Sequence, residues 1–124
     1  MNTKKILVVD DDAMITRFLK IVLEKAGRYS VRVENRGLMA AAAAEDFRPD
    51  LIILDVNMPD MDGGAVASQI KENEDLKQVP IVYLTGSVSE EEANAQITIG
   101  ESSVIAKPIN LEKLVECIEK NLAK

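Results

Sequence analysis

Short apolar runs of strand length alternate along this chain with longer segments of helical periodicity, and this alternation strongly constrains the fold. The first run, Lys5–Val9, is followed by apolar residues at helical spacing, which are Ile15, Phe18, Leu19, Val22 and Leu23. Gly27 then provides a helix stop. Strands that alternate with helices are joined by right-handed crossovers and form a parallel sheet covered on both faces. The pattern therefore predicts an α/β fold.

The rest of the chain repeats this unit. Further strands are predicted at Ser30–Glu34, Leu51–Leu54, Val79–Leu84 and Ser103–Ala106. Further helices are predicted at Leu38–Ala44, at Ala65–Asn73, after the capping box Ser89–Glu92, and from the cap Asn110 to Leu122. Five such units predict a five-stranded parallel sheet of order 2-1-3-4-5, in a flavodoxin-like three-layer sandwich with five helices.

Composition limits the class of protein. A length of 124 residues fits a single domain, residues 1–124, and 47% hydrophobic residues supply a core. The net charge of −6 argues against a nucleic-acid partner. The single cysteine, Cys117, cannot form an internal disulfide, which suits a reducing compartment. The sequence has no recognisable signal peptide or membrane span, so we expect a soluble cytoplasmic protein with no membrane partner.

Reactive side chains follow four of the predicted strands directly. They are Asp10, Asp11 and Asp12 after the first strand, Asp55 after the third, Thr85 after the fourth and Lys107 after the fifth. The carboxyl ends of parallel strands meet at one edge of the sheet, where ligands bind. Carboxylates gathered there require a cation, and oxygen ligands suit Mg²⁺. A lysine and a hydroxyl beside that cation suit a phosphoryl group, so the pattern indicates phosphoryl chemistry on an aspartate.

Each of these residues also has an ordinary structural interpretation. The aspartate triplet can form a solvated turn, with Asp12 as a helix N-cap, and Asp55 can begin a turn. Thr85 and Lys107 can lie in surface loops. Four separate structural explanations are less economical than one functional explanation, because every one of these residues directly follows a predicted strand. The Lys107–Pro108 bond is predicted to be cis, which would turn Lys107 over the cleft.

Taken together, the motifs make the chain resemble a response-regulator receiver domain of the chemotaxis-regulator type. Such domains are phosphorylated on aspartate in two-component signalling. The resemblance covers Ile6 to Leu122, and the motifs are Ile6–Asp11, Pro49–Asp55, Met58–Gly63, Leu84–Thr85 and Lys107–Pro108.

The resemblance implies a role for each site residue. Asp55 would be the phosphoacceptor and Thr85 the switch hydroxyl, and Lys107 would bind phosphate. The implied Mg²⁺ ligands are Asp11, Asp10 through water, Asp55 and the backbone carbonyl of Asn57. The implied partners are a sensor histidine kinase or phosphotransfer protein and a downstream protein target. The chain has no His, so it cannot itself be the phosphohistidine donor. The domain would be no enzyme beyond its own aspartyl phosphorylation and dephosphorylation.

One departure and one alternative accompany this interpretation. The family's switch aromatic, three residues before the lysine, is Val104 here, so we expect the conformational signal to lie mainly in the helix from Ser89 to Ile99.

The alternative is a small haloacid-dehalogenase-like phosphohydrolase with Asp10 as nucleophile, since Asp10 and Asp12 form a D-x-D after a strand. That family's following Gly-Thr is missing. A flavodoxin is rejected because three aspartates would repel the flavin phosphate.

Overall fold

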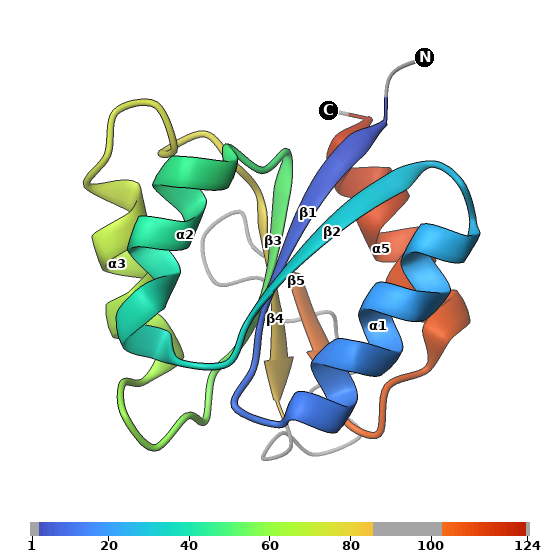
Figure 1. The fold of residues 1–124 in the computed structure, drawn as a ribbon, viewed down its shortest axis with the longest axis horizontal. Coiled ribbons are helices and arrows are strands. Elements are labelled where there is room, and N and C mark those ends of the chain that lie inside the picture. The colour runs from blue at the N-terminus through green and yellow to red at the C-terminus, as the bar shows by residue number, and fades with distance from the viewer. Residues whose placement is uncertain (1–2, 86–102, 124) are drawn as a thin grey trace.

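The fold was analysed in a computed structural model, which describes residues 3–85 and 103–123 (Figure 1). The strands of its sheet are β1 (Lys4–Val9), β2 (Tyr29–Glu34), β3 (Leu51–Asp55), β4 (Ile81–Thr85) and β5 (Ser103–Ala106). All neighbouring strands are parallel, and their order is β2-β1-β3-β4-β5. The predicted strand order and direction are therefore confirmed.

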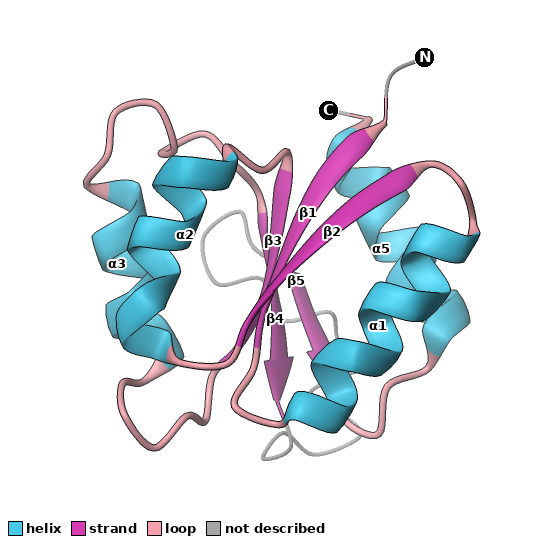
Figure 2. Cartoon of the chain, in the orientation of Figure 1, coloured by secondary structure: helices cyan, strands magenta, loops and turns pink. Residues whose placement is uncertain are grey.

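Helices cover both faces of this sheet. The described residues contain the α-helices α1 (Ala13–Lys25), α2 (Ala40–Phe47), α3 (Gly63–Lys71) and α5 (Leu111–Leu122). Helices α1 and α5 lie on one face and α2 and α3 on the other, which makes three layers (Figures 1 and 2). Four of the five expected helices are thus present. The helix expected from Ser89 lies outside the described residues.

The central strands are buried on both faces, which explains why their sequences are continuously apolar. In β1, Leu7 packs toward α2 and α3, whereas Ile6 and Val8 pack toward α1 and α5. Strand β3 alternates in the same way, with Ile52 on the first side and Ile53 on the second. This two-sided core holds β1 and β3 side by side, with their carboxyl ends at the same edge.

The helix boundaries follow from local capping. Asp12 caps α1, since its Oδ1 accepts the Met14 N–H at 3.0 Å, and Asn110 caps α5 by accepting the Lys113 N–H at 3.1 Å. Both predicted caps are confirmed. After α1, Gly27 adopts a positive φ of 79°, a conformation that glycine tolerates best.

Two predicted helices have wrong boundaries at both ends, and α3 stops at Lys71 instead of Asn73. The helix expected over Leu38–Ala44 begins as a 3₁₀ turn at Gly37–Met39, and α2 continues to Phe47. The helix expected from Ala65 begins at Gly63, because the Asp62 side chain accepts the Ala65 N–H at 2.9 Å. In both places a carboxylate takes backbone N–H groups that the sequence pattern alone did not assign.

Side chains of α1 cover part of the outer edge of β2. Lys20 Nζ donates to the Val31 carbonyl at 2.8 Å, and the Val31 N–H donates to Glu24 Oε2 at 3.0 Å. Lys20 and Glu24 also pair with each other at 3.2 Å. Both backbone groups of Val31 that face away from β1 are therefore hydrogen-bonded within the chain.

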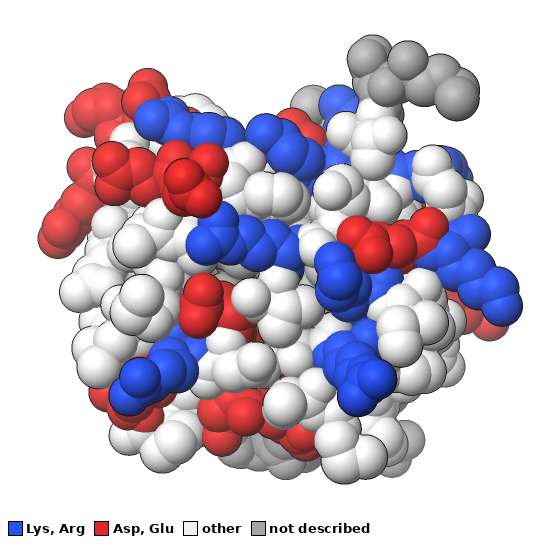
Figure 3. Space-filling view, viewed as in Figure 1, with Lys and Arg blue, Asp and Glu red and all other residues white. Residues whose placement is uncertain are grey.

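Acidic and basic side chains are interspersed on the molecular face shown in Figure 3. Several form ion pairs between elements, such as Arg32 with Asp46 at 2.7 Å and Arg48 with Asp75 at 2.9 Å. Exposed pairs of this kind contribute little to stability. None of the helices in the described part of the chain is long and apolar enough to cross a membrane.

Candidate functional site

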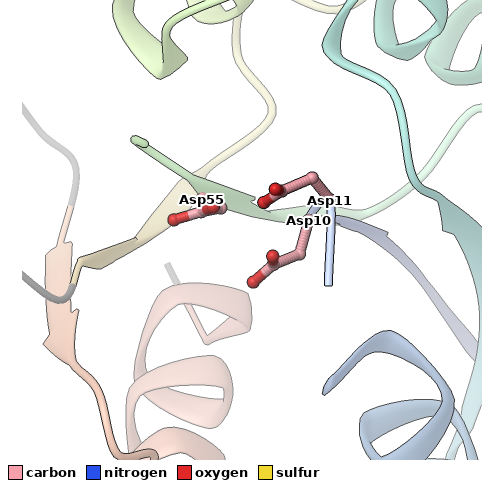
Figure 4. A group of neighbouring side chains, drawn as sticks. All are labelled: Asp10, Asp11 and Asp55. Atoms are coloured by element: carbon pink, nitrogen blue, oxygen red, sulfur yellow. The ribbon is translucent and has the colours of Figure 1, made fainter. Parts of the chain in front are cut away.

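Three aspartates from two strand ends meet at the carboxyl edge of the sheet. Asp10 and Asp11 follow β1, and Asp55 is the last residue of β3. Because Val9 pairs with Leu54 in the sheet register, the two strands end at the same level. One carboxylate oxygen from each aspartate lies within 4.8 Å of the others, with Asp10 and Asp11 extending to the side where Asp55 lies (Figure 4).

Asp10 is the most deeply buried member, with no exposed surface. Its Oδ1 accepts the Asp12 N–H at 2.9 Å. Burial raises the pKa of the Asp10 carboxyl above its ordinary value, and the negative charge of Asp55 adds to the rise. The Asp12 N–H and the Lys107 ammonium oppose this effect without cancelling it. The Asp10 carboxylate is therefore desolvated, and a cation beside it would reduce the free-energy cost of burying its charge.

Lys107 brings a positive charge to the aspartates from the end of β5. Its Nζ lies 2.9 Å from Asp10 Oδ2 and 3.4 Å from Asp55 Oδ1. Its N–H donates to the Thr85 carbonyl at 2.8 Å, and the Lys107–Pro108 peptide bond is cis. Burial lowers the pKa of Lys107, but the interactions with Asp10 and Asp55 outweigh it and raise the pKa above its ordinary value. The ammonium stays charged between the two carboxylates.

Thr85 and Asn57 lie beside this group. Thr85 is the last residue of β4 and is buried, and the residue before it, Leu84, pairs with Asp55 in the register. Asn57 is exposed in the loop after β3, and its N–H donates to Asp55 Oδ1 at 3.3 Å. The topology thus gathers all the predicted site residues at one edge of the sheet.

The arrangement fits a divalent cation. Three carboxylates and one ammonium leave two formal negative charges in excess. Among the described residues, the buried Asp10 Oδ2 has its ion pair with Lys107 but no hydrogen bond. The Lys107 ammonium already places one cation 2.9 Å from this oxygen, so the case for a metal rests on the negative charge that remains in excess. An all-oxygen donor set of this kind suits Mg²⁺ better than a transition metal.

Sequence reasoning missed two residues that support the site. Asn35 follows β2 directly, and its Nδ2 donates to the Asp10 carbonyl at 2.7 Å. Asp60 accepts the Leu38 N–H at 3.0 Å and the Gly37 N–H at 3.2 Å, and these bonds, that from Leu38 first, lower the pKa of Asp60. Asn35 could have been found by applying the strand-end rule to the second strand as well. The Asp60 contacts join distant segments, and no local pattern announces them.

Comparison with known proteins places this site in a family. The model of the response regulator receiver domain family matches residues 6–119. The chain belongs to this family. The match includes every described strand and helix, apart from the first two residues of β1 and the last three of α5. It therefore covers the whole site.

Curated relatives differ in how much of their length the receiver domain occupies. The chain is 27% identical over 119 residues to the polar-differentiation response regulator DivK of Brucella anthropi, covering 96% of both proteins. It is 39% identical over 104 residues to protein-glutamate methylesterase/protein-glutamine glutaminase 3 of Rhodospirillum rubrum. That match covers 84% of this chain but only 28% of the methylesterase. Receiver domains similar to this one therefore occur both nearly alone and as part of a longer protein.

Solved structures agree with the fold and carry a metal in one case. The chemotaxis protein CheY4 of Vibrio cholerae is 33% identical, with a TM-score of 0.82, covering 95% of this chain and 98% of CheY4. The receiver domain of sensor histidine kinase PA1611 from Pseudomonas aeruginosa is 25% identical, with a TM-score of 0.84, covering 98% and 99%. In that receiver domain a magnesium ion is coordinated in the active-site cleft.

The alternative of a haloacid-dehalogenase-like phosphohydrolase is not supported. The family match over residues 6–119 is to receiver domains, and the Gly-Thr expected after the D-x-D is missing. Asp10 is fully buried, its Oδ1 accepts the Asp12 N–H, and its Oδ2 is paired with Lys107. Asp12, the second acid of the D-x-D, is used as the N-cap of α1.

Proposed function

We propose that this receiver domain accepts a phosphoryl group on Asp55 from the phosphohistidine of a partner protein, in a reaction that requires Mg²⁺. The observation that carries the proposal is the position of Lys107, whose ammonium lies between the carboxylates of Asp10 and Asp55. A fixed positive charge beside a carboxylate at a strand end is the arrangement that phosphoryl transfer needs.

In the proposed step, a carboxylate oxygen of Asp55 attacks phosphorus and forms the new P–O bond. The P–N bond of the phosphohistidine breaks, and its electron pair stays on the imidazole nitrogen of the partner. Lys107 neutralises charge on the transferring oxygens. We assign Asp11, Asp55 and the Asn57 carbonyl as ligands of Mg²⁺, and Asp10 as a residue that would contact the ion through water. Bound Mg²⁺ would neutralise further negative charge on the phosphoryl group.

The phosphorylated state is proposed to act through protein contacts. The Thr85 hydroxyl would hydrogen-bond a phosphoryl oxygen and shift the segment that follows β4, as a change in population between two states. Val104, which pairs with Tyr83 across β4 and β5, has no ring that could move with it. The signal would then pass mainly through the segment that begins after Thr85.

The remaining assignments follow from this mechanism. The proposed partners are a sensor histidine kinase or phosphotransfer protein as donor and a downstream protein as target. Residues 1–124 would act as one receiver domain that catalyses only its own phosphorylation and dephosphorylation. A kinase donor and a single unpaired cysteine both suit the cytoplasm.

Labelling with a small phosphodonor tests the proposal. The protein is incubated with acetyl phosphate and Mg²⁺, and the adduct is located by mass spectrometry at acidic pH. We expect one phosphoryl group on the peptide containing Asp55, and none in the Asp55→Asn variant. Asp46→Asn, a change at an exposed surface ion pair, should label like the wild type. Full labelling of Asp55→Asn, or labelling without any divalent cation, would overturn the proposal.

A further inference from the structure

The connection between β2 and α2, residues 35–39, contributes no predicted ligand to the site, yet it is hydrogen-bonded to both loops that do. One loop is the acidic loop, Asp10–Asp12, which follows β1. The other is the β3–α3 loop, residues 56–62, which contains Asn57. Contacts to both loops from one short segment suggest that the β2–α2 connection sets their relative position.

Asn35 makes the contact to the acidic loop. Its Nδ2 donates to the Asp10 carbonyl at 2.7 Å and to Thr16 Oγ1 at 3.0 Å, so both amide hydrogens have acceptors. Thr16 is buried in α1, and its hydroxyl donates to the Ala13 carbonyl at 3.2 Å. The Asp10 N–H donates to the Glu34 carbonyl at 3.1 Å. Asp10 is therefore held from both sides by the end of β2 and the residue after it.

Gly37 and Leu38 make the contact to the β3–α3 loop. Their N–H groups donate to the two carboxylate oxygens of Asp60, at 3.2 and 3.0 Å. Gly37 also packs closely against this loop, because a Cβ added there would lie 3.1 Å from Met61 Cβ and 3.3 Å from Met58 Cε. Hydrogen bonds and packing together fix the loop against the 3₁₀ turn that precedes α2.

We propose that the β2–α2 connection positions the metal site, with Asn35 as the positioning residue for Asp10 and Asp60 as its counterpart on the β3–α3 loop. The inference rests on the proposed function, since it concerns the proposed Mg²⁺ ligands. Groups that orient metal ligands without touching the metal typically change metal affinity by 10- to 100-fold when they are removed. Asn35 orients Asp10 through its main chain, so we expect an effect at the lower end of that range.

The test measures Mg²⁺ affinity directly, by calorimetric titration and by the Mg²⁺-dependent rise in melting temperature. Asn35→Ala is expected to raise the Mg²⁺ dissociation constant about tenfold. Asp60→Ala should raise it as well. Thr16→Val removes the hydroxyl that accepts from Asn35 and should raise the constant by less, whereas Thr16→Ser keeps the hydroxyl and should restore wild-type affinity.

Asn73→Ala is the matched control. Asn73 Oδ1 accepts the Asp75 N–H at 2.9 Å in the connection that follows α3, away from the site. This change also removes one asparagine side-chain hydrogen bond and should lower the melting temperature of the metal-free protein. It should leave the Mg²⁺ dissociation constant unchanged.

Two results would overturn the inference. One is wild-type Mg²⁺ affinity in Asn35→Ala together with a loss of stability like that of Asn73→Ala, which would make Asn35 purely structural. The other, decisive if Asn35→Ala does not fold, is equal Mg²⁺ affinity in Thr16→Val and Thr16→Ser. Failure of the proposed function looks different, because the wild type itself would then bind no Mg²⁺ or Asp55→Asn would be phosphorylated.

Discussion

The ammonium of Lys107 lies 2.9 Å from a carboxylate oxygen of Asp10 that has no exposed surface. This contact joins the end of β5 to the end of β1 across two intervening strands, β3 and β4. The lysine thus serves two purposes. It compensates a buried charge in this structure, and in the proposed mechanism it would also meet the incoming phosphoryl group.

Replacing Lys107 should therefore cost stability as well as phosphorylation. Lys107→Met leaves Asp10 buried without its ionic partner, and we expect a loss of about 2 kcal/mol in the free energy of unfolding without metal. Added Mg²⁺ should recover part of that loss, since a cation near Asp10 replaces the missing charge. Urea unfolding with and without Mg²⁺ measures both effects. Lys77→Met, which breaks an exposed pair with Glu74, should change stability little.

Asp11 and Asp12 are adjacent acids with different expected roles. Asp11→Ala should weaken Mg²⁺ binding strongly, because Asp11 is assigned as a direct ligand. Asp12→Ala should instead lower the free energy of unfolding by about 1 kcal/mol through loss of the α1 cap. Titration calorimetry and denaturant unfolding on both variants separate the two roles. Equal Mg²⁺ affinity in Asp11→Ala and the wild type would remove Asp11 from the ligand set.

Gly63 permits the close approach of α3 to the end of β3, which carries Asp55. A Cβ at this position would lie 2.7 Å from Val56 Cα and 3.0 Å from the Asp55 carbonyl oxygen. Gly63→Ala should therefore displace the backbone at Asp55, cost about 1–3 kcal/mol in stability and slow labelling by acetyl phosphate. Gly64→Ala is the control, because a Cβ added there would meet a side-chain atom, Asp62 Oδ1 at 3.2 Å, and not the backbone. If both variants have the same labelling rate and the same free energy of unfolding, the close contact at Gly63 does not matter for phosphorylation.

The interactions of Glu24 lead us to expect that the stability of the protein depends on pH. The hydrogen bond from the Val31 N–H, followed by the interactions with Lys20, lowers the pKa of Glu24 below its ordinary value of 4.5. Its stabilising contribution is thus present above that value and is lost as the pH falls through the lower folded-state pKa. Glu24→Gln should lose this contribution at neutral pH and show a shallower decline in acid. Melting temperatures from neutral pH down to about pH 3 provide the comparison, and parallel wild-type and variant curves would contradict it.

Site residues with reactive side chains could be predicted from the sequence where they lie at the end of a strand. Asp10, Asp55 and Lys107 each follow an apolar run, and parallel topology alone brings such positions together. The boundaries of α2 and α3 were less predictable, because they depend on which carboxylate takes the first N–H groups of each helix. At the 3₁₀ turn Gly37–Met39 that leads into α2, that carboxylate is Asp60, from a loop distant in sequence, and only the folded chain brings it there.

Gly63 shows a different limit. Two consecutive glycines after Asp62 are typical of a turn, so the sequence predicts a helix that begins only after both of them, at Ala65. In the structure Gly63 opens α3, and its missing side chain is needed for close packing against the backbone of Val56. A glycine required for space cannot be told by sequence pattern from one required for a turn, because both lack the same atom.

The pairing of Lys20 and Glu24 with Val31 has a consequence for how this protein meets other molecules. An exposed edge strand is a template on which another chain can add a strand, and such addition leads readily to self-association. Here the outward N–H and carbonyl of Val31, within β2, are already hydrogen-bonded to α1. A strand arriving at this edge would have to displace both side chains from the Val31 backbone. At that point the sheet is thus protected against the addition of another strand.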